Sequence, residues 1–384
     1  MRNTLAGLMA VATVTAAGAT SRAQVAPEAE APALPAARLW VGPMPFAGPR
    51  TLRDDFFPIL SDPGKWLTVL ANTDVFKSHL MILPNAPVPG KPTPELSEAQ
   101  LRQLATLFRE RGIKVAFEVG GLRMGNDKPQ KGEWGKQVAA NEFTPLKRWL
   151  DAGGTIDYLT TDHAVMMNLG HRCYEGTDCG LTLDETLDEL AVYFEEMARR
   201  IPGVRFGCIE SLGFFHVKAP DGTEYPRTVP KLPIWHFEDY FDALLAALAR
   251  HHLALDHFHI DFGFEGVDYD GRRLKKGGPD FGRILGVESY VQSKGVHVGP
   301  IVNAFHDRSV ENPDSAVASR QAYDRTLQFF NAYVAAGGTA DQLVVQTWQP
   351  FPDRTGPDDR AYTTLNLARE VMTSEAFRRA LSAR

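Results

Sequence analysis

Four acidic residues stand at or near the carboxyl ends of segments whose composition is typical of β-strands. They are Glu118 in KVAFEVGG, Asp162 in DYLTTDH, Glu210 in RFGCIESLG and Asp261 in DHFHIDFGFEG. A carboxyl group is a general acid when protonated and a general base or nucleophile when ionised, and pairs of such groups cleave glycosidic bonds. Four acids at equivalent places in successive strand-then-helix units predict one acidic pocket ringed by strand ends, which is the layout of an enzyme.

The order of the strands allows two ways of pairing these acids. Glu210 and Asp261 fall on strands expected to be neighbours, about 4.8 Å apart in a sheet, which suits the carboxyl separation of about 5–5.5 Å in a retaining glycosidase. Asp162 and Asp261 have one strand between them, and the wider gap suits an inverting pair with a water molecule between the carboxyl groups. We expect Glu210 to be the general acid/base and Asp261 the nucleophile or base, with Asp162 as the second candidate.

Other polar and aromatic residues near predicted strand ends are candidates for binding substrate. Lys, His and Asn side chains recognise hydroxyl groups through hydrogen bonds, and a tryptophan ring offers a flat apolar face for stacking on a sugar. This second set comprises Glu118, Lys77, His79, His163, His259, Asn303 and Trp348. Each has a structural alternative, because an acid can pair with a nearby cation and hold the rim together, a histidine can be a core residue, and a tryptophan can fill a barrel.

Eight strand-like segments alternate with amphipathic helical ones, in which apolar residues recur at three and four positions. The strands are predicted within residues 38–44, 74–83, 113–120, 155–162, 204–211, 255–263, 296–305 and 342–351. Several helical segments end at a glycine expected to form a left-handed C-cap, namely Gly112, Gly153, Gly203 and Gly337. This count predicts a single (β/α)8 barrel over residues 38–384. A doubly wound open sheet usually has a Gly-rich phosphate loop after its first strand, and PMPFAGPRTLRDD contains none.

The sixth predicted strand indicates which way its side chains point. In His257-Phe258-His259-Ile260-Asp261, apolar and polar residues alternate, so one face can pack on helices while the two histidines and Asp261 point into the barrel. Barrel interiors are normally filled with branched apolar side chains. Three ionisable groups there indicate a functional purpose, expected at the carboxyl-end rim.

The N-terminal residues are predicted to lie outside the barrel. Residues 1–23 combine an early arginine, an apolar stretch from Leu5 to Val14 and a small-residue ending, which indicates an export signal cleaved after Ala23. Residues 24–37 are rich in Ala and Pro without periodicity and predict an unstructured tether. Nothing downstream approaches the roughly 20 apolar residues of a membrane helix. We therefore expect an exported protein, periplasmic or extracellular, without a membrane span.

Charge argues against nucleic acid as a partner. Cleavage of the signal would leave 39 of the 41 basic residues against 47 acidic ones, so the net charge would move from −6 to −8. No basic run remains that could neutralise a phosphate backbone. Neutral or weakly charged substrates fit this chain better.

The three cysteines fall in two different settings. Cys173 and Cys179 lie in the polar, Gly-containing segment HRCYEGTDCGL, and an exported chain can oxidise them to a disulfide. Zinc is the other interpretation of such a pair, but His171 would supply only a third ligand, and zinc sites usually take three or four. Cys208 lies in an apolar strand and is expected to be a buried thiol.

Taken over its mature length, the chain resembles secreted bacterial TIM-barrel proteins of the glycoside hydrolase type. The matching segments are FEVGG, TTDH, CIESLG, HIDFG and QTWQPF. The resemblance implies a carbohydrate substrate and no cofactor or metal. The chain departs from the large clan with an Asn-Glu pair on strand four and a nucleophilic Glu on strand seven, because those places hold Thr161-Asp162 and Asn303. An Asp on strand four, Asp162, together with an Asp on strand six, Asp261, is similar to the α-galactosidase-like clan. The Lys that usually stands two residues before the first of these acids is Thr160 here.

Two other classes of function stay open. A divalent-metal sugar isomerase or epimerase of the xylose-isomerase type would use Glu210, Asp261 and His259 as ligands, but the expected last-strand Glu is replaced by the run Gln346-Thr347-Trp348. A barrel without catalytic activity could instead bind carbohydrate. The separation of the acidic groups distinguishes a glycosidase from a barrel that only binds carbohydrate, because binding needs no carboxyl pair at catalytic distance.

Overall fold

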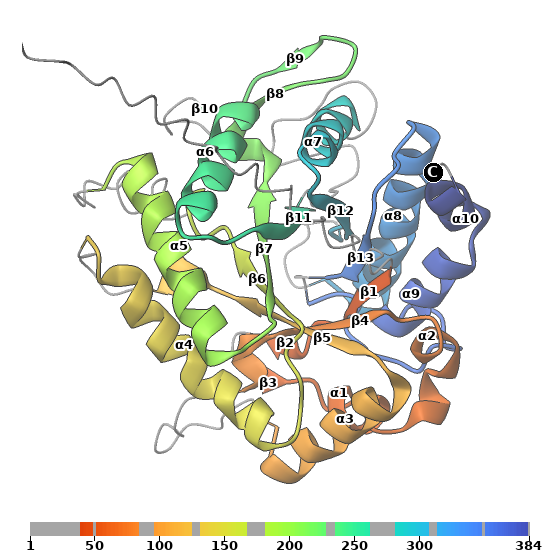
Figure 1. Cartoon of the computed structure of the whole chain (residues 1–384). Coiled ribbons are helices and arrows are strands. Elements are labelled where there is room, and N and C mark those ends of the chain that lie inside the picture. Colours follow the sequence, from red (N-terminus) through yellow and green to blue (C-terminus); the bar gives the residue numbers. More distant parts are fainter. Residues whose placement is uncertain are drawn as a thin grey trace, which may run out of the picture. The chain divides into compact units, whose positions relative to one another are not determined.

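A closed barrel of eight parallel strands forms the centre of the structure (Figure 1). The structure is a computed structural model that describes residues 39–48, 51–83, 96–124, 131–166, 181–227, 235–261, 281–306, 313–347 and 350–382. The barrel strands are β1 (Leu39–Gly42), β4 (Val75–His79), β5 (Lys114–Val119), β6 (Tyr158–Asp162), β7 (Arg205–Ser211), β11 (Leu255–Asp261), β12 (His297–Val302) and β13 (Leu343–Gln346). They pair in the order β1-β13-β12-β11-β7-β6-β5-β4, and β4 pairs with β1 to close the ring. The predicted (β/α)8 barrel is confirmed.

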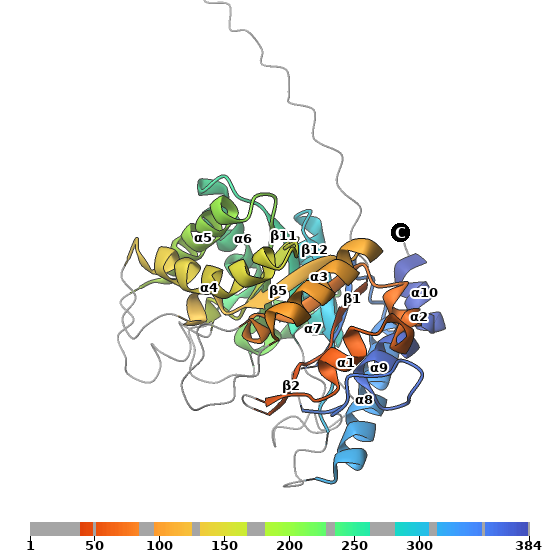
Figure 2. The same ribbon diagram turned by 90° about the horizontal axis from the view of Figure 1, so that it is seen from below.

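Helices alternate with these strands along the chain and surround the barrel (Figures 1 and 2). The long ones are α3 (Glu98–Arg111), α4 (Trp134–Asp151), α5 (Leu183–Arg200), α6 (Phe237–Arg250), α7 (Phe281–Ser293), α8 (Ser315–Ala335), α9 (Thr364–Thr373) and α10 (Glu375–Ser382). Two short helices, α1 (Phe56–Leu60) and α2 (Leu67–Leu70), stand between β1 and β4. Among the described helices, none is both long and apolar enough to cross a membrane.

Local sequence signals explain where several helices begin and end. Ser97 and Thr182 form capping boxes with Gln100 and Glu185 at the starts of α3 and α5, an arrangement in which the cap contributes about 1 kcal/mol. At the end of α3, Gly112 has a φ of 69°, a left-handed conformation that favours glycine. The three other glycines expected to end helices also have positive φ, at positions 153, 203 and 337.

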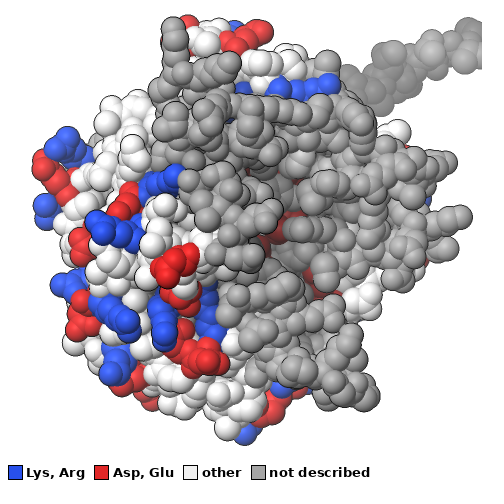
Figure 3. Space-filling model, turned by 180° about the vertical axis from the view of Figure 1, so that it is seen from behind, with Lys and Arg blue, Asp and Glu red and all other residues white. Residues whose placement is uncertain are grey.

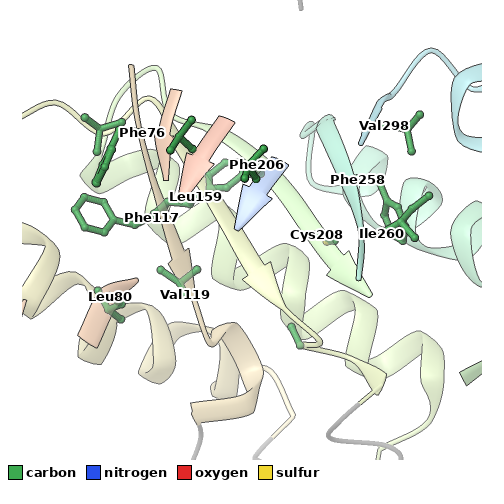
Figure 4. Packing of buried hydrophobic residues seen from close by; sticks show 14 of the residues in the cluster. Phe76, Leu80, Phe117, Val119, Leu159, Phe206, Cys208, Phe258, Ile260 and Val298 are labelled. Atoms are coloured by element: carbon green, nitrogen blue, oxygen red, sulfur yellow. The ribbon is translucent and has the colours of Figure 1, made fainter. Parts of the chain in front are cut away.

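Alternation along the strands divides the core into two layers. One set of side chains points outward and packs against the helices, as Phe76, Phe117, Phe206, Phe258 and others do in Figure 4. The opposite set fills the barrel interior and comprises Trp40, Val75, Ala116, Tyr158, Ile209, Ile301 and Val344. A residue's parity along its strand therefore decides whether it faces the helices or the barrel axis.

Two small sheets supplement the barrel. Strands β2 (Phe46–Gly48) and β3 (Thr51–Leu52) pair after β1. Strands β8 (Phe215–Lys218), β9 (Glu224–Tyr225) and β10 (Trp235–His236) form a three-stranded sheet between β7 and α6. The predicted signal, the tether, Trp348 and the Cys173–Cys179 pair lie outside the described residues, so these remain predictions.

Candidate active site

One histidine links two carboxyl groups at the carboxyl ends of β6 and β11. Asp162 ends β6 and Asp261 ends β11, and both have the parity that points into the barrel. Nδ1 of His163 contacts Asp162, and its Nε2 lies 3.8 Å from Oδ2 of Asp261. Asn303, directly after β12, donates from Nδ2 to Oδ1 of Asp261 at 3.5 Å. These four residues form the rim cluster.

The rim cluster remains open to solvent. The side chains of His163, Asp162 and Asp261 are 12%, 15% and 22% exposed, whereas Glu118 and Glu210 are each 1% exposed. Figure 3 shows acidic side chains recessed near the centre of one face of the molecule. Of the four acids singled out from the sequence, Asp162 and Asp261 are thus the two that a substrate can touch directly.

Electrostatics set the protonation of the rim cluster. Burial opposes the charged form of His163, but Asp162 and then Glu210 and Asp261 raise the pKa of its ring to about 9. Burial also raises the pKa of Asp261, against the opposite effect of His163. At neutral pH an imidazolium therefore lies between Asp162 and Asp261, and Asp261 holds its proton to a higher pH than an exposed aspartic acid does.

A second polar group lies in the barrel interior, on strands β4, β5 and β13, and is buried. Nζ of Lys77, from β4, is 3.0 Å from Oε2 of Glu118 in β5 and donates to Oε1 of Gln346 in β13 at 2.8 Å. Nε2 of Gln346 donates to the same Glu118 oxygen at 3.0 Å. Burial raises the pKa of Glu118 to about 7, opposed by Lys77 and assisted by Asp162. We call Lys77, Glu118 and Gln346 the interior triad.

Glu210 does not join the rim cluster, contrary to the pocket expected from the sequence. It shares parity with Phe206 and Cys208, which pack on the helix side of β7, while Asp261 pairs in register with Ser211. Oε1 of Glu210 accepts from the hydroxyl of Tyr240 in α6 at 3.0 Å. Burial raises the pKa of Glu210 to about 8. The expected approach of Glu210 to Asp261 is not what the structure shows, because the two side chains leave opposite faces of the sheet.

The histidines of β11 point into the barrel, as their alternation predicted, but below the rim. His257 and His259 are fully buried, and their ring centroids lie 4.9 and 4.8 Å from that of Trp40. Nε2 of His257 contacts Oγ1 of Thr160 at 2.9 Å, and Nε2 of His259 contacts Oε1 of Gln342 at 2.9 Å. His259, proposed from the sequence to bind substrate, is thus a core residue in this structure.

One further residue expected from the sequence to bind substrate, His79, lies at the end of a barrel strand. His79 ends β4 in register with Glu118, and its Nδ1 accepts from the backbone N–H of Met81 at 3.1 Å.

Cys208 is a buried free thiol, as expected, and burial raises its pKa to about 12. Among the described residues, no group of three or more His, Cys, Asp or Glu side chains is placed to hold a metal ion.

Sequence reasoning missed two partners of the site, Gln346 and Tyr240. Gln346 has inward parity on β13, two residues after Val344 in the interior core, so alternation along that strand was a usable signal. Tyr240 lies on α6 and meets Glu210 only through tertiary packing. No local sequence pattern reports such a contact.

Comparisons with known proteins leave the family and the reaction of this chain open. No protein-family model and no curated protein matches the chain. A GH113 beta-1,4-mannanase structure is 12% identical, covers 91% of this chain and all of its own, and has a TM-score of 0.46. D-psicose 3-epimerase from Clostridium cellulolyticum H10 is 10% identical over 87% of this chain and 96% of its own, with a TM-score of 0.42. At such identities and TM-scores, these likenesses carry no argument about the reaction of this chain.

Proposed function

We propose that this barrel hydrolyses a glycosidic bond, with Asp162 and Asp261 as the carboxyl pair. The observation that carries the proposal is the rim cluster, in which two inward-facing, solvent-reachable carboxyl groups flank one histidine. One strand separates β6 from β11 in the ring, so their axes are about 9–10 Å apart. That spacing is nearer to the inverting arrangement, in which the carboxyl groups stand about 6.5–9.5 Å apart, than to the retaining one of about 5–5.5 Å.

The environments of the two acids suggest different roles. Burial raises the pKa of Asp261, against the opposite effects of His163 and of the Asn303 amide, and the raised pKa suits the general acid that protonates the leaving oxygen. Asp162 contacts His163, which can hold the carboxyl group in place, and we assign it the role of the general base that activates water. Glu118 and Lys77, expected from the sequence to bind substrate, belong to the interior triad, which is buried beneath the rim cluster, so we give them no direct contact with the sugar. Glu210 is excluded from direct contact by its burial and its outward parity.

The metal-isomerase alternative loses two of its expected ligands. Glu210 faces α6 and His259 is buried against Gln342, so neither converges with Asp261. A barrel that only binds carbohydrate is tested by activity itself. If turnover vanished with EDTA and returned with a divalent cation, the isomerase class would replace the proposed one.

A leaving-group experiment tests both the activity and the two roles. Wild-type protein is screened on nitrophenyl glycosides and on plant and bacterial polysaccharides, and Asp261→Asn and Asp162→Asn are compared on the substrate found. General acid–base catalysis contributes about 10²- to 10⁴-fold, so each variant should lose at least about 100-fold with a poor leaving group. A dinitrophenyl leaving group needs no protonation and should restore Asp261→Asn but not Asp162→Asn.

The matched control is Asp324→Asn, which removes an exposed carboxyl group on α8, away from the rim cluster. This variant should keep wild-type turnover. Unchanged turnover in Asp162→Asn and Asp261→Asn would contradict the proposal, as would the absence of hydrolysis across the whole panel.

A further inference from the structure

A pocket of about 200 Å³ lies on the small sheet that follows β7, outside the rim cluster. Polar side chains from β8, β9, β10 and the first turn of α6 line it, namely His216, Lys218, Glu224, His236, Glu238 and Asp239. Pockets for drug-sized ligands measure about 300–1,000 Å³. This smaller pocket therefore suits a single ring or a small polar group.

The pocket lies at the same end of the barrel as the rim cluster. Its sheet follows the carboxyl end of β7 and stands beside α6 (Figure 1). The chain enters the sheet directly from Phe214, whose ring centroid lies 6.0 Å from that of His163. His216 stands two residues further on, which is no more than about 7 Å of extended chain. A ligand made of several linked rings is therefore long enough to extend from the rim cluster to the pocket.

The small sheet places two imidazole rings side by side. His216 and His236 are register partners in the parallel pair of β8 and β10, and their ring centroids lie 5.5 Å apart. Phe215 and Val217 are buried, so alternation along β8 gives His216 and Lys218 the more exposed face. The polar lining of the pocket is thus fixed by strand pairing and does not depend on a loop conformation.

The side chains that line the pocket are not occupied with one another. Apart from the contact of the two imidazole rings, none of the six has a hydrogen bond or an ion pair with a described residue. Carboxylates only accept hydrogen bonds, the Lys218 ammonium only donates them, and an imidazole can do either. The lining therefore offers donors and acceptors together.

This mixture of groups selects the chemical class of the ligand. A metal cation would be repelled by Lys218, and the described residues hold no group of three ligands for one. An anion would face the three carboxyl groups of Glu224, Glu238 and Asp239. A hydroxyl group both donates and accepts, so a neutral ligand rich in hydroxyl groups can pair with the whole set.

We propose that this pocket is a carbohydrate subsite, which binds one ring of a neutral oligosaccharide or polysaccharide whose cleaved bond lies at the rim cluster. The inference deepens the proposed function and rests on it for the position of the cleaved bond. Binding of sugar at the pocket does not depend on turnover. The preferred substrate is thus a chain of several units, in place of a glycoside of one sugar.

Oligosaccharide binding without turnover tests this subsite. Protein that carries Asp162→Asn and Asp261→Asn is screened against arrayed neutral, acidic and amino oligosaccharides, and the dissociation constants of those captured are measured by calorimetry at increasing chain length. We expect neutral oligosaccharides to bind, the longer ones more tightly. Adding His216→Ala or Glu238→Gln should weaken binding of the longer ones about 10-fold, since each removes a hydrogen-bonding group.

The matched control is His251→Ala, which removes the C-cap histidine at the other end of α6. This variant should bind as its parent does. Capture of no neutral oligosaccharide, capture of acidic or amino sugars alone, or equal affinities in all variants would overturn the inference. Sugar binding without hydrolysis by the wild type would sink the proposed function and leave the subsite standing. Hydrolysis with affinities that His216→Ala and Glu238→Gln leave unchanged would do the reverse.

Discussion

His163 contacts both solvent-reachable carboxyl groups, so its charge governs how they titrate. Its raised pKa, about 9, keeps the ring cationic across the neutral range. A cation between two carboxyl groups lowers the cost of keeping both close together. The histidine is therefore the residue on which the division of labour between the two acids depends.

Removing this cation should change the pH dependence of catalysis. In His163→Asn the two carboxyl groups lose their shared counter-ion, so one of them holds its proton to higher pH. We expect the acidic limb of the pH profile of kcat/KM to move upward and activity at pH 6 to fall by at least about 10-fold. Initial rates between pH 4 and 9 provide the measurement. A profile that drops uniformly without moving would contradict this role.

The interior triad predicts a stability effect that depends on pH. Lys77→Met leaves the Glu118 carboxyl buried without its cation, and breaking a buried pair costs about 3–5 kcal/mol when the remaining group is charged. At pH 5.5 Glu118 can take up a proton, because burial already raises its pKa to about 7. Urea unfolding should therefore show a larger loss of unfolding free energy at pH 8.5 than at pH 5.5.

The control for this prediction is the exposed pair of Lys147 and Asp151 on α4. Lys147→Met should cost no more than about 1 kcal/mol at either pH, since surface ion pairs contribute little. Equal losses for Lys77→Met at both pH values would show that Glu118 does not change its charge.

At the scale of elements, strand parity decided which sequence predictions matched the structure. Alternation in β11 was read directly and placed Asp261 inside the barrel, as the structure shows. The same reading was available for β7, where Phe206 and Cys208 share parity with Glu210 and already indicate the helix side. Position at a strand end was a weaker signal than parity. It brought Glu210 into the expected pocket, whereas the structure turns this side chain toward α6.

The parity of β7 also predicts how the cysteines react. Cys208 is buried on the helix side with a pKa raised to about 12, so it should resist alkylation in the folded protein. If Cys173 and Cys179 form a disulfide in exported protein, alkylation in denaturant without reductant should label one cysteine. Mass spectrometry counts the labels. Labelling of native Cys208 would contradict the burial, and three labels in denaturant would contradict the disulfide.

At the scale of the whole molecule, several buried carboxyl groups share one property. Glu118 and Glu210 lie at the barrel wall, and Glu142 in α4 accepts from Tyr193 and from the backbone N–H of Gly120. Burial raises their pKa values to about 7, 8 and 7, respectively. These three carboxyl groups therefore bind more protons in the folded protein than in the unfolded chain between about pH 4.5 and 8, whereas His257 and His259, whose pKa values burial lowers, bind fewer below about pH 6.5. His163 adds to this difference up to about pH 9.

Stability should consequently fall as pH rises. A group with a raised folded pKa stabilises the protein below its unfolded pKa, and that contribution is lost as pH passes its folded value. We expect the melting temperature to decrease steadily from pH 6.5 to pH 8.5, a range in which the lowered pKa values of His257 and His259 no longer oppose the carboxyl groups. A Glu142→Gln/Glu210→Gln double variant should flatten this slope. A melting temperature that is constant or rises over this interval in the wild type would contradict the assignment.

The architecture was readable from the sequence because it rests on repeated local signals. Eight strand patterns, amphipathic helices and glycines at helix ends recur along the chain, and each agrees with its neighbours. The site was only partly readable. Contacts such as Lys77 with Gln346, or Glu210 with Tyr240, join residues from distant elements and are fixed by the closed ring and its packing.

The anomeric form of the first product tests the central claim most directly. Once a cleaved glycoside is known, ¹H NMR of the reaction in its first minutes shows whether the released sugar has inverted or retained configuration, before mutarotation mixes the anomers. A carboxyl pair on β6 and β11, with one strand between them in the ring, predicts inversion. With a poor leaving group, formation of that product should slow by at least about 100-fold in both Asp162→Asn and Asp261→Asn. Retained configuration in the wild type, or an unchanged rate with that substrate in either variant, would contradict the assignment of this pair.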